Sequence, residues 1–213
     1  EICVGDKRVK FIKNDCNRGL AYTLNHCLEV ANGEYIARMD DDDESHLDRF
    51  EKQVEFLDEH NEYGLVGSNM NLFDEERGIW GLRKYPEIVK KEDFLYRVAV
   101  PHPTIMARRS AYDVVNGYRD LPETLRVEDY DCFMRMFARG VKMYNFQEPL
   151  FNYREDSRCA KKKKYKYRFN EMFVRKNGFK ELGINKLKSV PYIVKPLIAG
   201  LIPQKIIKQG QKR

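Results

Sequence analysis

Four consecutive aspartates, Asp40 to Asp43, directly follow the apolar run 35–39, which predicts a buried strand. In an open α/β sheet the functional crevice lies outside the carboxyl ends of the strands, so carboxylates placed there face a ligand site. Four like charges repel one another, and a hard divalent cation with oxygen ligands offsets that repulsion. A solvated acidic loop is the alternative for a bare charge run. The preceding strand, and a helix start predicted at Ser45 with Asp48 three residues later, favour a metal site.

A second acidic pair, Glu128 and Asp129, opens a helix predicted over 128–138. A carboxylate at such a place can act as a general base that takes the proton of an attacking hydroxyl. Acidic residues are also common in the first turn of a helix simply because they complement the helix dipole. The two residues by themselves leave both interpretations open.

Three further side chains can contact a ligand, and each also has an ordinary structural explanation. His102 stands between two prolines, which hold it rigidly, although a lone histidine in a loop is more often structural. Arg18 lies beside Gly19 at a predicted helix start, where it can meet phosphates, but a surface arginine is equally expected. Trp80 suits a sugar ring and suits ordinary packing at least as well.

The composition is that of a globular protein with one sizeable core, at 42% hydrophobic and 12% aromatic residues. The five cysteines show no CxxC spacing and are odd in number, so neither a disulfide framework nor a zinc site is indicated, and a reducing compartment is favoured. The start of the sequence does not resemble a signal peptide, and no apolar run is long enough to predict a membrane span.

The net charge of +6 is unevenly divided between an acidic body and a basic tail. Residues 158–213 hold 17 Lys and Arg against two Glu, whereas residues 1–157 carry more acidic than basic side chains. The last stretch mixes aliphatic residues with lysines, and Pro191, Pro196 and Pro203 are expected to prevent one long helix. Short amphipathic pieces on an anionic membrane surface fit this composition. Packing on the protein's own domain, or on a partner, is the alternative.

The first half of the chain alternates between strand and helix patterns. We expect a strand at 9–12, a helix through 20–31, a strand at 34–39, a helix at 46–60 with Phe50, Val54 and Leu57 inward, and a strand at 65–67. This order favours a parallel sheet covered by helices.

The pattern loosens from Asn69 to Pro103 and then becomes regular again. The later elements predicted are a short helix around 90–99, a strand at 104–107, a short helix at 109–115, the helix at 128–138, and one or two closing strands over 144–153.

Several motifs in order resemble the family 2 glycosyltransferases of GT-A fold. The motifs are Asn17-Arg18-Gly19-Leu20, the segment 33–43 (GEYIARMDDDD), the segment 48–53 (DRFEKQ), Pro101-His102-Pro103-Thr104, and Glu128-Asp129-Tyr130-Asp131. The resemblance covers residues 9–155 and implies an α/β mixed sheet flanked by helices. It divides the chain into a glycosyltransferase domain at 1–157 and a basic, amphipathic, helical C-terminal tail at 158–213. The family pattern normally begins with a strand–helix–strand unit that holds the nucleotide, and the expectation is that this unit is missing here.

The resemblance also implies residue roles. Asp40 and Asp42 form the D-x-D pair that would bind Mn²⁺ or Mg²⁺, with Asp40 toward the ribose or metal-bound water. Asp129 is the expected base, supported by Glu128. Donor contacts are expected from Arg18, Gly19, Asp40, Asp41 and Asp43, and a diphosphate or acceptor contact from His102.

The implied activity is metal-dependent, inverting transfer of a sugar, of the hexosyltransferase kind, from a nucleotide-diphosphate sugar such as a UDP-sugar. The implied acceptor is a saccharide or a lipid-linked sugar in bacterial cell-surface polysaccharide synthesis, at the inner face of the cell membrane in the cytoplasm.

Three other functions compete with this one. A non-catalytic remnant that cannot bind donor is the first. A nucleic-acid binder working through 161–168 is the second, and the acidic body argues against it, so no nucleic-acid partner is expected. A phosphotransferase with an aspartate nucleophile is the third, and it would leave Glu128 and Asp129 without a task.

Overall fold

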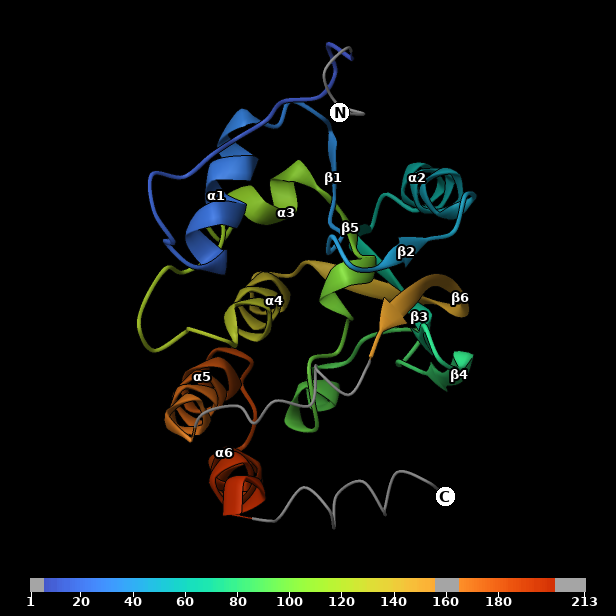
Figure 1. The fold of residues 1–213 in the computed structure, drawn as a ribbon. Helices are drawn as coiled ribbons and strands as arrows, with labels where there is room; N and C mark the ends of the chain where they lie inside the picture. Colours follow the sequence, from blue (N-terminus) through green and yellow to red (C-terminus); the bar gives the residue numbers. More distant parts are fainter. Residues whose placement is uncertain (1–5, 156–164, 202–213) are drawn as a thin grey trace.

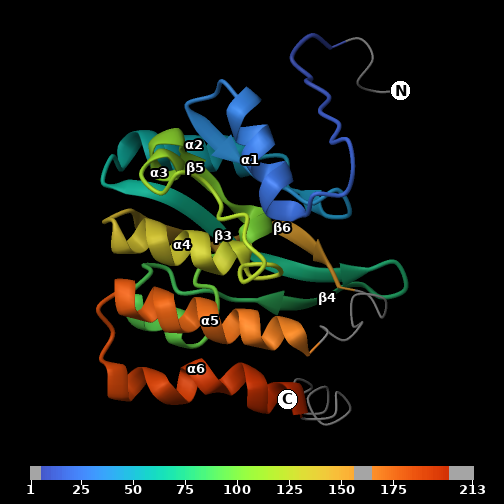
Figure 2. The ribbon, with the colours of Figure 1, turned by 90° about the vertical axis from the view of Figure 1, so that its left-hand side faces the viewer.

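The computed structural model describes residues 6–155 and 165–201. A six-stranded sheet has helix α2 on one face and helices α1, α3 and α4 on the other (Figure 1). Helices α5 and α6 form two further layers outside α4 (Figure 2). A mixed sheet between helices is the architecture that the family resemblance implies.

The strands lie in the order β1-β5-β3-β6-β2, and β4 pairs with the second half of β3. Their bounds are β1 Tyr35–Ala37, β2 Glu44–Ser45, β3 Tyr63–Asp74, β4 Gly78–Arg83, β5 Met106–Arg108 and β6 Lys142–Arg154. Among these described strands, only β3 and β6 pair in parallel. The prediction of a parallel sheet was therefore wrong. Strands β1 and β3 do run in the same direction, but the antiparallel strand β5 lies between them.

The helices are α1 Leu20–Val30, α2 Arg49–Glu59, α3 Arg109–Asp113, α4 Glu128–Ala138, α5 Lys166–Glu181 and α6 Lys186–Leu201, with 3₁₀ turns at Lys91–Leu95 and His102–Thr104. Strand β3 supplies both cores because successive side chains of a strand point to opposite faces. Leu65 joins the large cluster beneath α1, α3 and α4, whereas Val66 packs with Leu57 of α2.

Several predicted elements are confirmed, and helix α4 has the predicted bounds. Its apolar face carries Phe133 and Met136, both fully buried. Gly140 follows in a left-handed conformation, with φ of 88°, which ends the helix at low steric cost. The helices near 20–31 and 109–115 and the strand around 144–153 are also present.

The strand predicted at 9–12 is absent. The backbone there forms none of the sheet's pairings among the described residues, and Phe11 is 87% exposed. A β-propensity pattern becomes a strand only where a neighbour exchanges backbone hydrogen bonds with it. No described strand lies alongside this segment.

Helix α2 begins at Arg49 rather than at 46, and Ser45 does not start it, since Ser45 pairs with Phe151 in the sheet. The prediction that Phe50 points inward was also wrong, because its side chain is half exposed. Val54 and Leu57 do face inward, as predicted. The buried residues of α2 are Arg49, Gln53 and Leu57, so two of these three are polar.

The loosened stretch after Asn69 contains a β-hairpin that the sequence did not predict. Strand β3 continues to Asp74 and turns into β4 through Gly78, whose φ is 66°. The Asp74 carboxylate closes the turn by accepting the backbone N–H of Arg77 at 2.8 Å. Further along, the helix predicted around 90–99 is a 3₁₀ turn at Lys91–Leu95.

The described part of the basic tail forms two helices of 16 residues each. Phe179 and Val174 of α5 are buried in the large core cluster. Pro191 and Pro196 lie inside α6, so the expectation that they would interrupt a helix here was wrong. A proline removes one backbone donor, and packing along one face of a helix can offset that loss. The Lys161–Lys164 run lies outside the described residues.

No helix among residues 6–155 and 165–201 combines the length and the apolar character that crossing a bilayer requires.

Candidate active site

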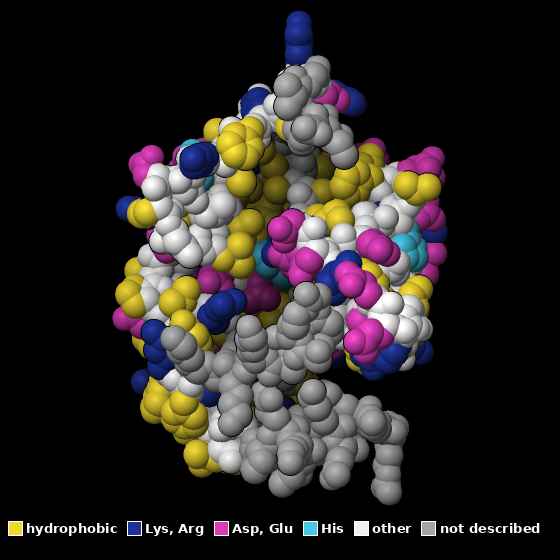
Figure 3. All heavy atoms as spheres, in the orientation of Figure 1, with side chains coloured by type: hydrophobic (Ala, Val, Ile, Leu, Met, Phe, Trp, Pro, Cys, Tyr) yellow, Lys and Arg dark blue, Asp and Glu magenta, His cyan; other side chains and the backbone are white. Residues whose placement is uncertain are grey.

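A pocket of about 790 Å³ opens where the end of β1 meets the first turns of α1 and α4. It is lined by Asn17, Gly19, Leu20, Thr23, Arg38, Asp40, His102, Pro103, Leu125, Arg126, Glu128, Asp129, Tyr153 and Tyr167. Acidic side chains gather near the centre of the face drawn in Figure 3. One cavity therefore contains five of the candidate site residues predicted from the sequence, although more than a hundred residues separate the first from the last. These are Gly19, Asp40, His102, Glu128 and Asp129.

The N-terminal end of α1 forms one wall of the pocket. The Asn17 side chain accepts the backbone N–H of Gly19 at 3.1 Å, and Gly19 has a φ of 86°, which a side chain would strain. The turn thus places the N-terminal end of α1 at the pocket wall, and a helix N-terminus favours an anion. Arg18 does not line the pocket; its guanidinium lies over the Tyr22 ring, 4.6 Å from the ring centre.

The four aspartates lie in three different environments. Asp40 lines the pocket and forms a two-bond ion pair with Arg38, one of whose contacts is 2.6 Å. Asp41 and Asp42 are exposed. Asp43 is buried, and one carboxylate oxygen accepts the backbone N–H of Arg154 at 2.8 Å. Its other oxygen has no partner among the described residues.

Burial, opposed by the bond from Arg154 and reinforced by the charges of Asp40 and Asp42, raises the pKa of Asp43 to about 6. With this pKa, the Asp43 carboxyl changes charge near pH 6.

Helix α2 fixes the position of the acidic run from behind. Arg49 is fully buried and donates to the backbone carbonyls of Arg38 and Ile105, at 2.9 and 3.1 Å. Gln53 donates to the carbonyl of Thr104 at 2.8 Å. Burial lowers the pKa of Arg49 to about 10, which still leaves it charged at neutral pH. The DRFEKQ motif therefore acts through α2, tying the end of β1 to the segment before β5.

The first turn of α4 forms the opposite wall. Glu128 is buried and Asp129 half-buried, and both line the pocket. One oxygen of Asp129 accepts the backbone N–H of Tyr130 at 2.8 Å. This contact orients the Asp129 carboxylate at the beginning of the helix.

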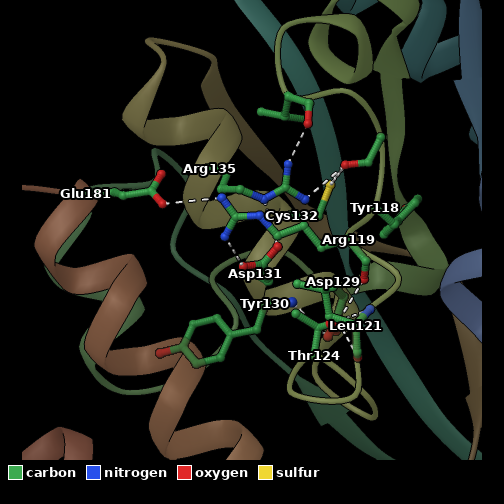
Figure 4. A network of polar contacts seen from close by, with 12 residues as sticks. Tyr118, Arg119, Leu121, Thr124, Asp129, Tyr130, Asp131, Cys132, Arg135 and Glu181 are labelled. Atoms are coloured by element: carbon green, nitrogen blue, oxygen red, sulfur yellow. Dashed lines mark hydrogen bonds and ion pairs between the residues drawn. The ribbon is translucent and has the colours of Figure 1, made fainter.

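In the same first turn of α4, Asp131 holds the helix against the preceding loop (Figure 4). It is buried and pairs with Arg135 at 2.7 Å and with Arg119 at 3.1 Å. Arg135 in turn donates to the carbonyls of Val115 and Gly117, at 2.7 and 2.9 Å. This network was not predicted from the sequence, although the four-residue spacing of Asp131 and Arg135 was a signal for it.

His102 lines the pocket but is 7% exposed. Its Nε2 lies 2.8 Å from the Tyr118 hydroxyl, so that nitrogen is engaged away from any ligand. Burial, and secondarily the charge of Arg38, holds the pKa of His102 well below its usual value, and the ring is neutral at physiological pH.

No sequence signal predicted the remaining wall, which is formed by Leu125, Arg126, Tyr153 and Tyr167. Arg126 has a φ of 72°, a left-handed conformation that few residues with side chains adopt. Tyr167 comes from α5, so the C-terminal region contributes to the pocket. Trp80 lies on β4 outside the pocket, beneath the guanidinium of Arg77.

No group of three or more His, Cys, Asp or Glu side chains gathers as a metal cage among the described residues. Mg²⁺ and related hard cations are commonly held by one or two carboxylates together with substrate phosphates. The unpartnered oxygen of Asp43 and the exposed carboxylate of Asp42 fit a site of that kind.

Comparisons with known proteins identify the family of the chain. Residues 1–116 match the family model described as glycosyl transferase family 2. The putative glycosyltransferase EpsE of Bacillus subtilis is 39% identical over 97% of this chain and 73% of its own length. The O-antigen biosynthesis glycosyltransferase WbnJ of Escherichia coli is 30% identical over 76% of this chain and 63% of its own. The chain belongs to glycosyltransferase family 2.

A solved structure shares the fold at low sequence identity. Residues 1–349 of TarS from S. aureus, in a complex with UDP-GlcNAc, align with a TM-score of 0.58 at 15% identity. The alignment covers 85% of this chain and 52% of that chain, so the present sequence spans about half of the TarS fragment. The GT-A fold expected from the motifs is confirmed.

Proposed function

We propose that the protein transfers a sugar from a nucleotide-diphosphate sugar to a hydroxyl of a saccharide or lipid-linked acceptor, with inversion at the anomeric carbon. The observation that carries the proposal is the single pocket that brings Asp40, Glu128 and Asp129 together from segments far apart in the chain. Family membership supplies the reaction class, and the pocket supplies the carboxylates that this reaction needs.

In the proposed reaction the acceptor oxygen attacks the anomeric carbon while its proton passes to the Asp129 carboxylate. The bond from that carbon to the diphosphate oxygen breaks, and its electron pair leaves with the nucleoside diphosphate. Glu128, buried beside Asp129, would support the base. A single displacement from the opposite side inverts the anomeric carbon.

Asp42 and Asp40 would hold a divalent cation, with Asp43 behind them. Bound Mg²⁺ or Mn²⁺ would supply positive charge to neutralise the leaving diphosphate. The Arg38–Asp40 ion pair already fixes one carboxylate of this pair at the pocket wall. Gly19 and the start of α1 would face the donor's phosphates, with Arg18 and Asp41 at the periphery.

The donor proposed is a UDP-sugar, and the product a bacterial cell-surface polysaccharide. WbnJ is named for O-antigen biosynthesis, and the aligned TarS structure contains UDP-GlcNAc. A membrane-borne acceptor would place the protein at the inner face of the cell membrane as a peripheral protein, attached through the basic region 158–213. The charge of that region supports this arrangement.

Calorimetric titration of UDP-sugars, with Mn²⁺ and separately with EDTA, tests donor and metal together. We expect saturable heat only with the metal, and Asp42→Asn should weaken donor binding at least about tenfold, since one charge of the cation site is lost. Asp58→Asn, which removes a carboxylate far from the pocket on α2, is the control. Absence of heat at millimolar donor would favour the alternative, a non-catalytic member that cannot bind donor.

A further inference from the structure

Helix α6 has two faces of different character. Ser189 and Pro196 are buried, and Tyr192 and Ile193 pack against the large core cluster. This face holds α6 on α5. The Tyr165 hydroxyl adds a link between the two helices, donating to the carbonyl of Leu197 at 3.4 Å.

The opposite face of α6 is apolar and exposed. Its residues recur every three or four positions, as one side of a helix requires: Leu187 (84% exposed), Val190, Val194, Ile198 and Leu201 (73% exposed). Hydrophobic side chains gather over α5 and α6 at the lower left of Figure 3. Exposed aliphatic side chains in a continuous row indicate a surface that another apolar phase covers.

Lysines flank this row on both sides. At about 100° of rotation per residue, Lys188 and Lys195 lie roughly a quarter turn to one side of the row, and Lys186 about as far to the other. All three are exposed, and no acidic residue occurs from Leu182 to the end of the chain. Such lysines can extend toward a surface while the centre of the row enters it.

Helix α5 adds aromatic side chains to the same hairpin. Tyr165, Phe169 and Phe173 are each at least 42% exposed and four residues apart, so they share one side of α5. Aromatic and basic side chains together are typical of segments that lie at the boundary between headgroups and acyl chains.

We infer that the exposed face of α6, from Leu187 to Leu201, docks in the headgroup region of an anionic lipid bilayer. A lipid surface is favoured over a protein partner because the flanking lysines, with no acidic residue from Leu182 onward, each add affinity at an anionic surface. The inference rests on the proposed membrane-borne acceptor and names the surface that reaches it.

Docking through α6 would also orient the pocket. Tyr165 touches the C-terminal end of α6, and Tyr167, two residues further on, lines the pocket. Helix α5 thus connects the docked helix to the pocket, so docking through α6 would fix how the pocket is oriented relative to the bilayer surface.

Vesicle co-sedimentation of the full chain tests the inference. We expect binding to phosphatidylcholine vesicles that contain phosphatidylglycerol, little binding to pure phosphatidylcholine, and weaker binding as NaCl is raised. The double variant Leu187→Glu, Ile198→Glu should bind at least about tenfold more weakly, because it loses two inserted side chains and adds repulsion. A matched control, Val114→Glu with Ile79→Glu, alters two exposed apolar residues elsewhere and should bind like the wild type.

Equal binding to both vesicle types, or an α6 variant that binds like the control, overturns the inference. Sedimentation velocity on the same proteins is the second measurement. If the wild type self-associates, the α6 variant is monomeric and vesicle binding is unchanged, the face is an interface between copies instead. Donor calorimetry on the α6 variant separates the two proposals, since retained donor heat with lost vesicle binding leaves the proposed function intact.

Discussion

Two aspartates beside the pocket, Asp131 and Asp43, are buried to a similar degree. They differ in how far neighbouring groups compensate their charge. Asp131 has two arginine partners, and those arginines anchor the adjoining loop. Asp43 has one backbone donor, two acidic neighbours and a carboxylate oxygen without a partner among the described residues. The paired Asp131 holds the first turn of α4 in one geometry, whereas the buried charge of Asp43 is compensated only in part.

The largest expected effect is on the rate of the reaction and comes from the pocket wall formed by the first turn of α4. Asp129→Asn should reduce the rate of sugar transfer about 10²- to 10⁴-fold, because the amide cannot accept the acceptor's proton. Release of nucleoside diphosphate, followed with a coupled assay, measures the rate. Donor affinity by calorimetry should remain near that of the wild type. Full activity of the Asp129→Asn variant would show that Asp129 is not the base.

The next largest effect is on the stability of the protein and comes from the ion-pair network of α4. Asp131→Ala should lower the free energy of unfolding by about 3–5 kcal/mol, because it leaves the charge of Arg135 buried without its partner. Urea unfolding followed by far-ultraviolet circular dichroism measures it. The exposed neighbour Asp120, changed to Asn, should stay within about 0.5 kcal/mol. Similar losses for the two variants would show that the buried ion pairs of Asp131 do not stabilise the protein.

The smallest effect concerns Asp43 and depends on pH. Its folded pKa, near 6, exceeds the ordinary value of 3.8, so the folded state binds the proton more tightly and loses stability as pH rises between those values. Relative to Asp43→Asn, the wild type should lose about 1–2 kcal/mol between pH 4 and pH 7. Urea unfolding at both values of pH measures this, with exposed Asp41→Asn as control. A difference that does not change with pH would show that burial does not act on this carboxyl.

The sequence predicted elements best where local signals agreed with one another. Helix α4 combines a first-turn acidic cluster, an apolar stripe and a terminal glycine, and both its ends were predicted correctly. The β3–β4 hairpin was missed because Gly78 and the Asp74 turn lie among residues with no clear alternation. Phe50 was placed inward by hydrophobicity alone. The structure buries Arg49 instead, whose Nη2 donates to two backbone carbonyls and whose Nε donates to Gln53.

The residues of the candidate site likewise fall into those that the sequence predicted and those that it did not. Motif residues such as Gly19, Asp40, Glu128 and Asp129 could be named from the sequence because their types and order are specific to the family. Arg126 and Tyr167 could not, since the first depends on a left-handed backbone conformation and the second on how α5 packs against α4. Neither property has a local sequence signal.

The chain's order of residues by itself determined the family, the acidic run, the acidic helix start and the separation of charge between body and tail. Tertiary structure alone decided the direction of β5, the burial of Asp43 and the pairing of Asp131 with two arginines. The physical reason is the distance along the chain over which each kind of interaction acts. Periodicity and turn chemistry act over a few residues, whereas burial and ion pairing depend on which distant segments come into contact.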